Sequence, residues 1–123
     1  MKLPVSQYYQ VCFFAGSSSQ IKLWVQIPVM TNTQCAPIYQ RQLTLNANQM
    51  CAGGVKGKDS CRGDSGGPLM SYDESVVRGR PGNQWTAAGI VSIGPAVCGA
   101  EGRPGIYTRV GPYVSWVLDQ LKP

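Results

Sequence analysis

The chain has 123 residues, of which 43% are hydrophobic, and a formal net charge of +5. That length suits one domain of ordinary size with a packed core. No apolar run reaches the ~18 residues of a membrane-spanning helix, and the cations are scattered rather than gathered in a block, which argues against a membrane or nucleic-acid partner. Residues 1–16 are interrupted by Pro4 and by polar side chains, so they make a poor secretory signal.

In chain order, the pattern predicts short strands joined by glycine-rich loops. Residues 21–30 alternate and are rich in β-branched and aromatic side chains, which is typical of a strand. The sequence T-N-T from Thr31 predicts the cap of a short helix that ends near Tyr39. Further strands are expected at 49–52, 68–72, 84–93 and 105–110, with loops at 53–67, 73–83 and 94–103.

A helix is predicted over residues 112–121, because apolar side chains recur there at helical spacing and Pro112 stands near its start. Short strands, glycine loops and one terminal helix together favour an all-β barrel or sandwich.

The chain contains five cysteines and no histidine. No two cysteines form a C-x-x-C pair, so neither zinc nor another cofactor is expected. Two disulfides and one leftover thiol are the simpler interpretation, which indicates an oxidising, extracellular compartment. Spacing alone leaves the pairing open, and an odd cysteine allows a partner outside the chain.

Ser65 is the candidate nucleophile, because it lies between glycines in the sequence GDSGGP at 63–68. Glycines allow a tight bend and a close approach of substrate. Backbone N–H groups of such a turn can converge on a developing oxyanion without any side chain. Taken alone, however, the same letters are equally consistent with a glycine-rich surface turn.

The longer run KDSCRGDSGGPL at 58–69 closely resembles the chymotrypsin-like serine proteases, in particular their trypsin-like members. The similarity continues through QMCAGG at 49–54, GIVSIG at 89–94 and PGIYTRV at 104–110, in the order of the second half of that domain. It implies the C-terminal β-barrel of a double barrel with a C-terminal α-helix over residues 17–123, and it leaves residues 1–16 unmatched. Three segments look most like the arthropod clip-domain group: KLWVQIPVM at 22–30, QMCAGGVKGKDSC at 49–61 and GIYTRV at 105–110.

This resemblance implies a role for each residue that matches the family's motif. Ser65 corresponds to the nucleophile, the N–H groups of Gly63 and Ser65 to the oxyanion hole, and Asp64 to the partner of the amine released by zymogen cleavage. Asp59 corresponds to the floor of a pocket that selects Arg or Lys, because a buried carboxylate needs a cation and suits a guanidinium. The other implied pocket residues are Ser92, Gly94 and Gly105.

Two disulfides are also implied by the resemblance, Cys35–Cys51 and Cys61–Cys98. The first closes a loop of about fifteen residues, which is worth ~3 kcal/mol in the chain-entropy model. Cys12 is left without a partner that can be named.

The chain departs from the family's pattern in ways that bear on activity. The histidine base and its orienting aspartate come from the first half of the domain, and this sequence matches only the second. In a related triad system, loss of the base costs about 10⁶-fold in turnover. We therefore expect the isolated chain to be inactive, with the missing N-terminal half as a required partner. Ile93 stands where many relatives carry an aromatic residue, which predicts weaker substrate packing.

Three functions are compatible with these residues. The first is a serine endopeptidase that cleaves polypeptides after Arg or Lys. The second is a catalytically dead, protease-like binding protein that keeps the pocket, and the third is a non-functional remnant. Retention of Ser65 favours the enzyme, because non-catalytic relatives usually lose the nucleophile.

Overall fold

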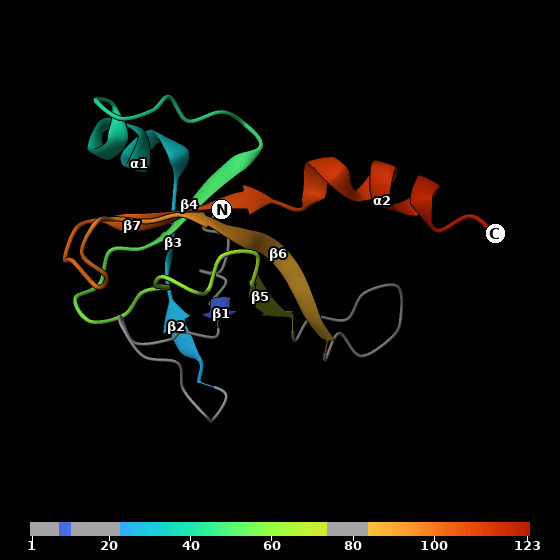
Figure 1. Cartoon of the computed structure of the whole chain (residues 1–123), viewed down its shortest axis with the longest axis horizontal. Coiled ribbons are helices and arrows are strands. Elements are labelled where there is room, and N and C mark those ends of the chain that lie inside the picture. Colours follow the sequence, from blue (N-terminus) through green and yellow to red (C-terminus); the bar gives the residue numbers. More distant parts are fainter. Residues whose placement is uncertain (1–7, 11–22, 74–83) are drawn as a thin grey trace.

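The computed structural model describes residues 8–10, 23–73 and 84–123 and shows an antiparallel sheet with one helix against it and a second helix that extends away (Figure 1). Among these residues the strand order is β2-β1-β5-β6-β7-β4-β3. The two edge strands, β2 (Val25–Ile27) and β3 (Val29–Met30), are separated in the chain by Pro28 alone. Because one extended segment forms both edges, the sheet closes on itself as a barrel, which confirms the predicted all-β class.

The remaining strands lie within one or two residues of their predicted positions. They are β4 (Gln49–Gly53), β5 (Pro68–Asp73), β6 (Gln84–Ile93) and β7 (Pro104–Arg109). The short β1 (Tyr8–Gln10) pairs with both β2 and β5. It lies inside residues 1–16, which the sequence left unmatched.

The strand predicted over residues 21–30 is divided at Pro28. Proline has no N–H to donate to a ladder, so it interrupts pairing at that point. Its carbonyl oxygen still accepts a hydrogen bond from the Gly53 N–H at 2.8 Å. This bond holds the segment against β4 at the corner where it passes from one edge of the sheet to the other.

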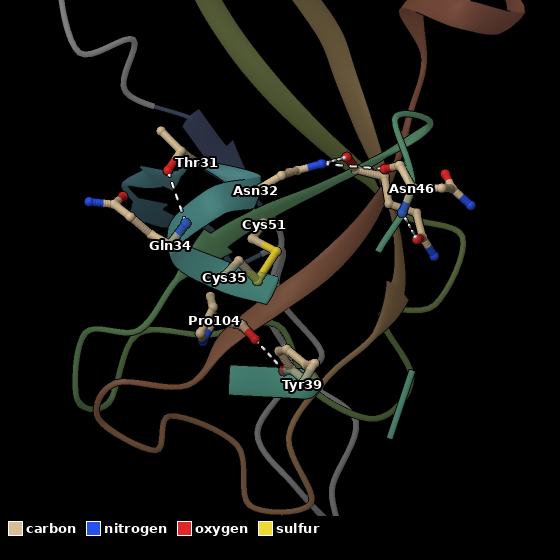
Figure 2. Close-up of a disulfide and its surroundings, with 9 residues drawn as sticks. Thr31, Asn32, Gln34, Cys35, Tyr39, Asn46, Cys51 and Pro104 are labelled. Carbon is tan, nitrogen blue, oxygen red and sulfur yellow. Dashed lines mark hydrogen bonds between the residues drawn. A yellow bond between two sulfur atoms is a disulfide. The ribbon is translucent and has the colours of Figure 1, made fainter. Parts of the chain in front are cut away.

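The predicted helix after Thr31 is confirmed as α1 (Asn32–Tyr39), and the Thr31 hydroxyl caps it by accepting the Gln34 N–H at 3.2 Å (Figure 2). The predicted C-terminal helix is divided into a 3₁₀ turn, η1 (Gly111–Tyr113), and α2 (Val114–Gln120). Figure 1 shows α2 extending away from the sheet. No helix among the described residues is long and apolar enough to cross a membrane.

Side-chain alternation divides the core into two clusters. Inside the barrel lie Ile27, Met50, Ala52, Leu69 and Tyr107. On the outer side, between α1 and the sheet, lie Cys35, Tyr39, Cys51 and Ile106. Neighbouring residues of one strand therefore enter opposite clusters, as Ile106 and Tyr107 do, because successive side chains point to opposite faces.

The disulfide Cys35–Cys51 joins α1 to β4, as the resemblance predicted (Figure 2). Both sulfurs are fully buried in the outer cluster. With a sequence separation of 16, the closed loop stabilises the fold by ~3 kcal/mol in the chain-entropy account. The disulfide anchors α1, which in turn reaches the candidate site through Tyr39.

Candidate functional site

Ser65 lies at the second position of a tight turn over residues 64–67. The Gly67 N–H donates to the Asp64 carbonyl at 2.8 Å, and Gly66 has a φ of +83°. A positive φ at the third position is the type II pattern, which favours glycine there. The turn is fastened to β6 by Gly66 N–H to Val91 O at 3.0 Å and Val91 N–H to Gly67 O at 2.9 Å. Ser65 is exposed at the tip of this fastened turn.

A second turn of the same kind directly precedes it. The Asp64 N–H donates to the Cys61 carbonyl at 3.1 Å, and Gly63 has a φ of +96°. The carboxylate of Asp64 folds back into this turn, where Oδ2 accepts the Cys61 N–H at 2.7 Å. Asp64 is only 4% exposed, so a buried charge closes the turn.

The predicted oxyanion donors differ from their neighbours in their hydrogen bonding. Within the described ranges, the backbone N–H groups of Gly63 and Ser65 donate to no acceptor, whereas those of Asp64, Gly66 and Gly67 all do. Two N–H groups without acceptors, one of them on the serine itself, are available to donate to an oxyanion.

Asp59 is a buried carboxylate, only 4% exposed, and its Oδ2 accepts the Gly99 N–H at 3.0 Å. Burial raises the pKa of the Asp59 carboxyl above its usual range. Hydrogen bonds from the backbone of Gly99 and Ser60 lower this pKa in part, and the charge of Asp64 raises it further. A cation brought close to Asp59 would offset the cost of burying its charge.

The residue after Asp59 is held by a tyrosine. The hydroxyls of Ser60 and Tyr107 lie 3.0 Å apart in a buried hydrogen bond. Gly105 lies against the same ring, because a Cβ there would be 3.1 Å from Tyr107 Cε2. A larger residue at position 105 would therefore require the Tyr107 ring to shift by a few tenths of an ångström.

Tyr39 fixes the start of β7 from the other side. Its hydroxyl donates to the Pro104 carbonyl oxygen in a buried hydrogen bond (Figure 2). Burial raises the pKa of Tyr39, the negative charge of Asp59 adds to that, and Arg103 opposes it. Tyr39 was not among the predicted site residues, since no pattern in the sequence links α1 to the loop before β7.

An open cavity of about 910 Å³ lies beside Ser65. Its lining comes from residues 60–62 and 65 of the nucleophile loop and from residues 91–98 at the end of β6. Of the predicted pocket residues, Ser92 and Gly94 line it, and a Cβ on Gly94 would meet no atom within 4 Å. Asp59 and Gly105 are not part of the lining, and Asp59 adjoins it through Ser60. Ile93 also faces the cavity and is 41% exposed.

The structure brings Cys61 and Cys98 to the lining of this one cavity but shows both as thiols. The Cys61–Cys98 disulfide therefore stays a prediction. Cys12, the leftover cysteine, lies outside the described residues.

Sequence reasoning did not identify Arg62, which is exposed at the second position of the first turn and lines the cavity. Nor did it identify Gly99, which lies 40 residues from the carboxylate it binds. The position of Arg62 inside the motif was a signal that could have been followed, whereas nothing local to Gly99 indicates its bond.

Comparison with known proteins identifies relatives along most of the chain. The model of the Trypsin family matches residues 10–117. CLIP domain-containing serine protease B4 of Anopheles gambiae is 47% identical over 107 residues, covering 86% of this chain and 28% of the relative. CLIP domain-containing serine protease HP8 of Bombyx mori is 44% identical over 107 residues, which cover 86% of this chain and 27% of the relative. Melanization protease 1 of Drosophila melanogaster is 43% identical over 106 residues, which cover 85% of this chain and 26% of the relative. The chain thus spans little more than a quarter of these relatives.

Proposed function

The chain belongs to the trypsin family of serine proteases and is similar to its arthropod clip-domain members, and we propose that it carries the nucleophile and primary pocket of an endopeptidase that cleaves after Arg or Lys. The observation that carries the proposal is the exposed Ser65 on its fastened turn, beside N–H groups without acceptors and a large cavity. The division into residues 1–16 and 17–123 stays a prediction, and the match to the Trypsin family begins earlier, at residue 10.

The proposed reaction is acyl transfer. The Ser65 Oγ attacks the carbonyl carbon of the cleaved bond while a base takes the hydroxyl proton. The N–H groups of Gly63 and Ser65 donate to the oxyanion that forms. The amine then leaves with a proton, and water releases the acyl group from Ser65.

The buried carboxylate of Asp59 supports the proposed specificity. Its pKa is raised by burial, so a cation from the substrate is stabilising there. An arginine guanidinium matches the two carboxylate oxygens, and a lysine ammonium binds as a point charge. Ser92, Gly94 and Gly105 are the proposed walls, with Gly94 leaving open space for a long side chain.

The base is the component that this chain lacks. The sequence contains no histidine, so we propose that the 123 residues alone do not cleave peptides and that an N-terminal half-domain supplies the histidine and aspartate. Exposed apolar side chains on α2 support such a partner, and the Cys35–Cys51 disulfide supports an extracellular location. Asp64 is the proposed partner of an activating N-terminal amine.

A fluorophosphonate probe tests the proposal, because it labels only an activated serine. Applied to a native preparation and followed by peptide mass spectrometry, the probe is expected to modify Ser65. The purified 123-residue chain is expected to remain unlabelled and to leave an Arg-containing chromogenic peptide uncut. A native protein whose Ser65 stays unlabelled would favour the binding protein or the remnant, and turnover by the purified chain would contradict the missing base.

A further inference from the structure

The loop after β4 and the loop before β7 are joined to each other through their backbones. The Gly57 N–H donates to the Gly99 carbonyl oxygen at 2.9 Å, and the Gly102 N–H donates to the Gly54 carbonyl oxygen at 2.8 Å. The approach is close, since a Cβ on Gly99 would lie 3.0 Å from the Gly57 Cα. In Figure 1 both loops reach the side of the molecule opposite α2. The two loops therefore form one continuous surface.

The loop after β4 presents two lysines on a tight turn. The turn begins at Val55 and ends at Lys58, whose N–H donates to the Val55 carbonyl oxygen at 3.0 Å. Its third residue, Gly57, has a φ of +75°, a conformation that favours glycine at this position. Lys56 at the tip and Lys58 at the end are both exposed, and Val55 beside them is 41% exposed. Two ammonium groups and an apolar side chain are therefore accessible on one hydrogen-bonded turn.

The loop before β7 adds a third cation on a turn of the same kind. The Arg103 N–H donates to the Ala100 carbonyl oxygen at 3.2 Å, and the third residue, Gly102, has a φ of +73°. Arg103 is exposed at the end of this turn, and Glu101 is exposed at its tip. The paired-turn surface, which is the exposed side of these two turns, thus carries three cations and one carboxylate.

The charges of the three cations are available to a partner. The ion pair found in the described part of the chain, Lys122 with Asp119, does not involve them. The carboxylate of Asp59 is close in sequence but turned inward, because it is 4% exposed and accepts the Gly99 N–H at 3.0 Å. None of the three cations lines the cavity beside Ser65. A surface with this excess of positive charge attracts anionic partners and repels cationic ones.

We propose that the paired-turn surface binds an acidic stretch of another polypeptide that contains an apolar residue. Carboxylates suit the three cations, and an apolar residue suits Val55. Glu101 disfavours a uniformly anionic chain such as a sulfated polysaccharide, whereas a polypeptide can place a polar or cationic side chain opposite it. The cations are scattered in the sequence, and the fold brings Lys56 and Lys58 to the same surface as Arg103. The proposal does not depend on the proposed catalysis.

Fluorescence anisotropy of labelled peptides with the purified chain tests the proposal. The peptides are blocked and carry one central Leu between two pairs of Glu, or the same Leu between two pairs of Gln. The Glu peptide is expected to bind roughly threefold more tightly or better at low salt, as a few exposed ion pairs allow. Added salt is expected to remove the difference by screening. A third peptide, with Glu pairs and Ser in place of Leu, is expected to bind more weakly because it leaves Val55 uncovered.

Variants assign the binding to the two turns. The triple variant with Lys56→Gln, Lys58→Gln and Arg103→Gln is expected to bind the Glu and Gln peptides equally. Glu101→Lys is expected to tighten binding of the Glu peptide, a gain that a loss of folding could not produce.

The matched control removes the same net charge from exposed positions outside the two turns. It combines Arg41→Gln, Arg62→Gln and Lys122→Gln, and all three of these cations are exposed. This control is expected to keep the preference for the Glu peptide.

Three outcomes would contradict the proposal. Equal binding of the Glu and Gln peptides by the unmodified chain would show that no acidic stretch is recognised. A preference lost in the control and kept in the triple variant of the two turns would show that the peptides bind elsewhere. Equal binding of the Leu and Ser peptides would contradict a polypeptide partner, and their displacement by a heparin oligosaccharide at lower concentration would then assign the surface to a sulfated polysaccharide.

Discussion

At the residue scale, burying the charge of Asp59 destabilises the folded chain, but the buried charge can bind a cation. Its pKa in the folded chain lies above the ordinary value of 3.8, first because of burial. A folded pKa above the unfolded one means that the folded state binds more protons, so stability is lost as pH rises from about 3.8 through the folded pKa. A bound amidinium offsets that loss, because it pairs with the ionised carboxylate.

The affinity of the chain for the fluorescent cation p-aminobenzamidine is therefore expected to rise with pH, with a midpoint above 3.8, the ordinary pKa of an aspartate. The ligand keeps its charge across this range, so the titration reports the carboxyl group. Fluorescence titrations at successive pH values measure it. Asp59→Asn is expected to abolish binding and to reduce the loss of stability between acidic and neutral pH in urea unfolding.

Asp119→Asn is the control for that experiment, because Asp119 is an exposed carboxylate that pairs with Lys122 far along α2. It is expected to leave both the affinity and its pH dependence unchanged. A midpoint at or below the ordinary pKa of an aspartate would contradict the raised pKa of Asp59.

At the scale of elements, the turn that carries Ser65 depends on the size of one residue. A Cβ at Gly67 would lie 2.8 Å from the Asp64 carbonyl oxygen, which is the acceptor that closes the turn. The obstacle is backbone, so no side-chain rotation can relieve it.

Gly67→Ala is expected to destabilise the chain by about 1–3 kcal/mol, the usual cost of overpacking. Gly111→Ala is the matched control, since a Cβ there meets nothing within 4 Å and φ is not positive. It is expected to change stability by no more than ~0.5 kcal/mol. Urea unfolding of the two variants compares them, and equal stabilities would show that the Asp64–Gly67 turn is not rigid.

The cap at Thr31 and the glycine turn at Ser65 follow local rules, so both could be predicted from the sequence. Pro28 was a visible signal for the division of the first predicted strand, because a central strand does not tolerate proline. The irregular register between Leu69 and Met70, and between Val91 and Ile93, has no such signal.

Contacts that complete the site could not be predicted because they join distant segments. The Gly99 N–H reaches Asp59, and the Tyr39 hydroxyl reaches the Pro104 carbonyl, across separations of 40 and 65 residues. The choice between barrel and sandwich was open for the same reason, since it depends on β2 and β3 pairing at opposite edges of one sheet. Local patterns locate elements, and the packing of the core determines how they meet.

At the scale of the whole molecule, α2 is a helix whose apolar side chains stay exposed among the residues that the structure describes. None of its residues is buried, and Trp116, Leu118 and the following Leu121 are 64%, 60% and 72% exposed. In Figure 1 the helix extends away from the barrel. A helix of seven residues is too short to be stable in water on its own, so this face needs a covering surface.

The purified chain is therefore expected to self-associate and to bind a hydrophobic dye, because contiguous exposed apolar surface of this kind is rare on soluble monomers. Replacing Leu118 and Leu121 together by lysine is expected to lower both dye fluorescence and the apparent mass in light scattering. Val55→Lys is the control, because Val55 is 41% exposed in the loop before Asp59, away from α2. A wild-type chain that runs as a dye-free monomer would show that α2 needs no cover, and would remove the support that this face gives to an N-terminal half-domain as partner.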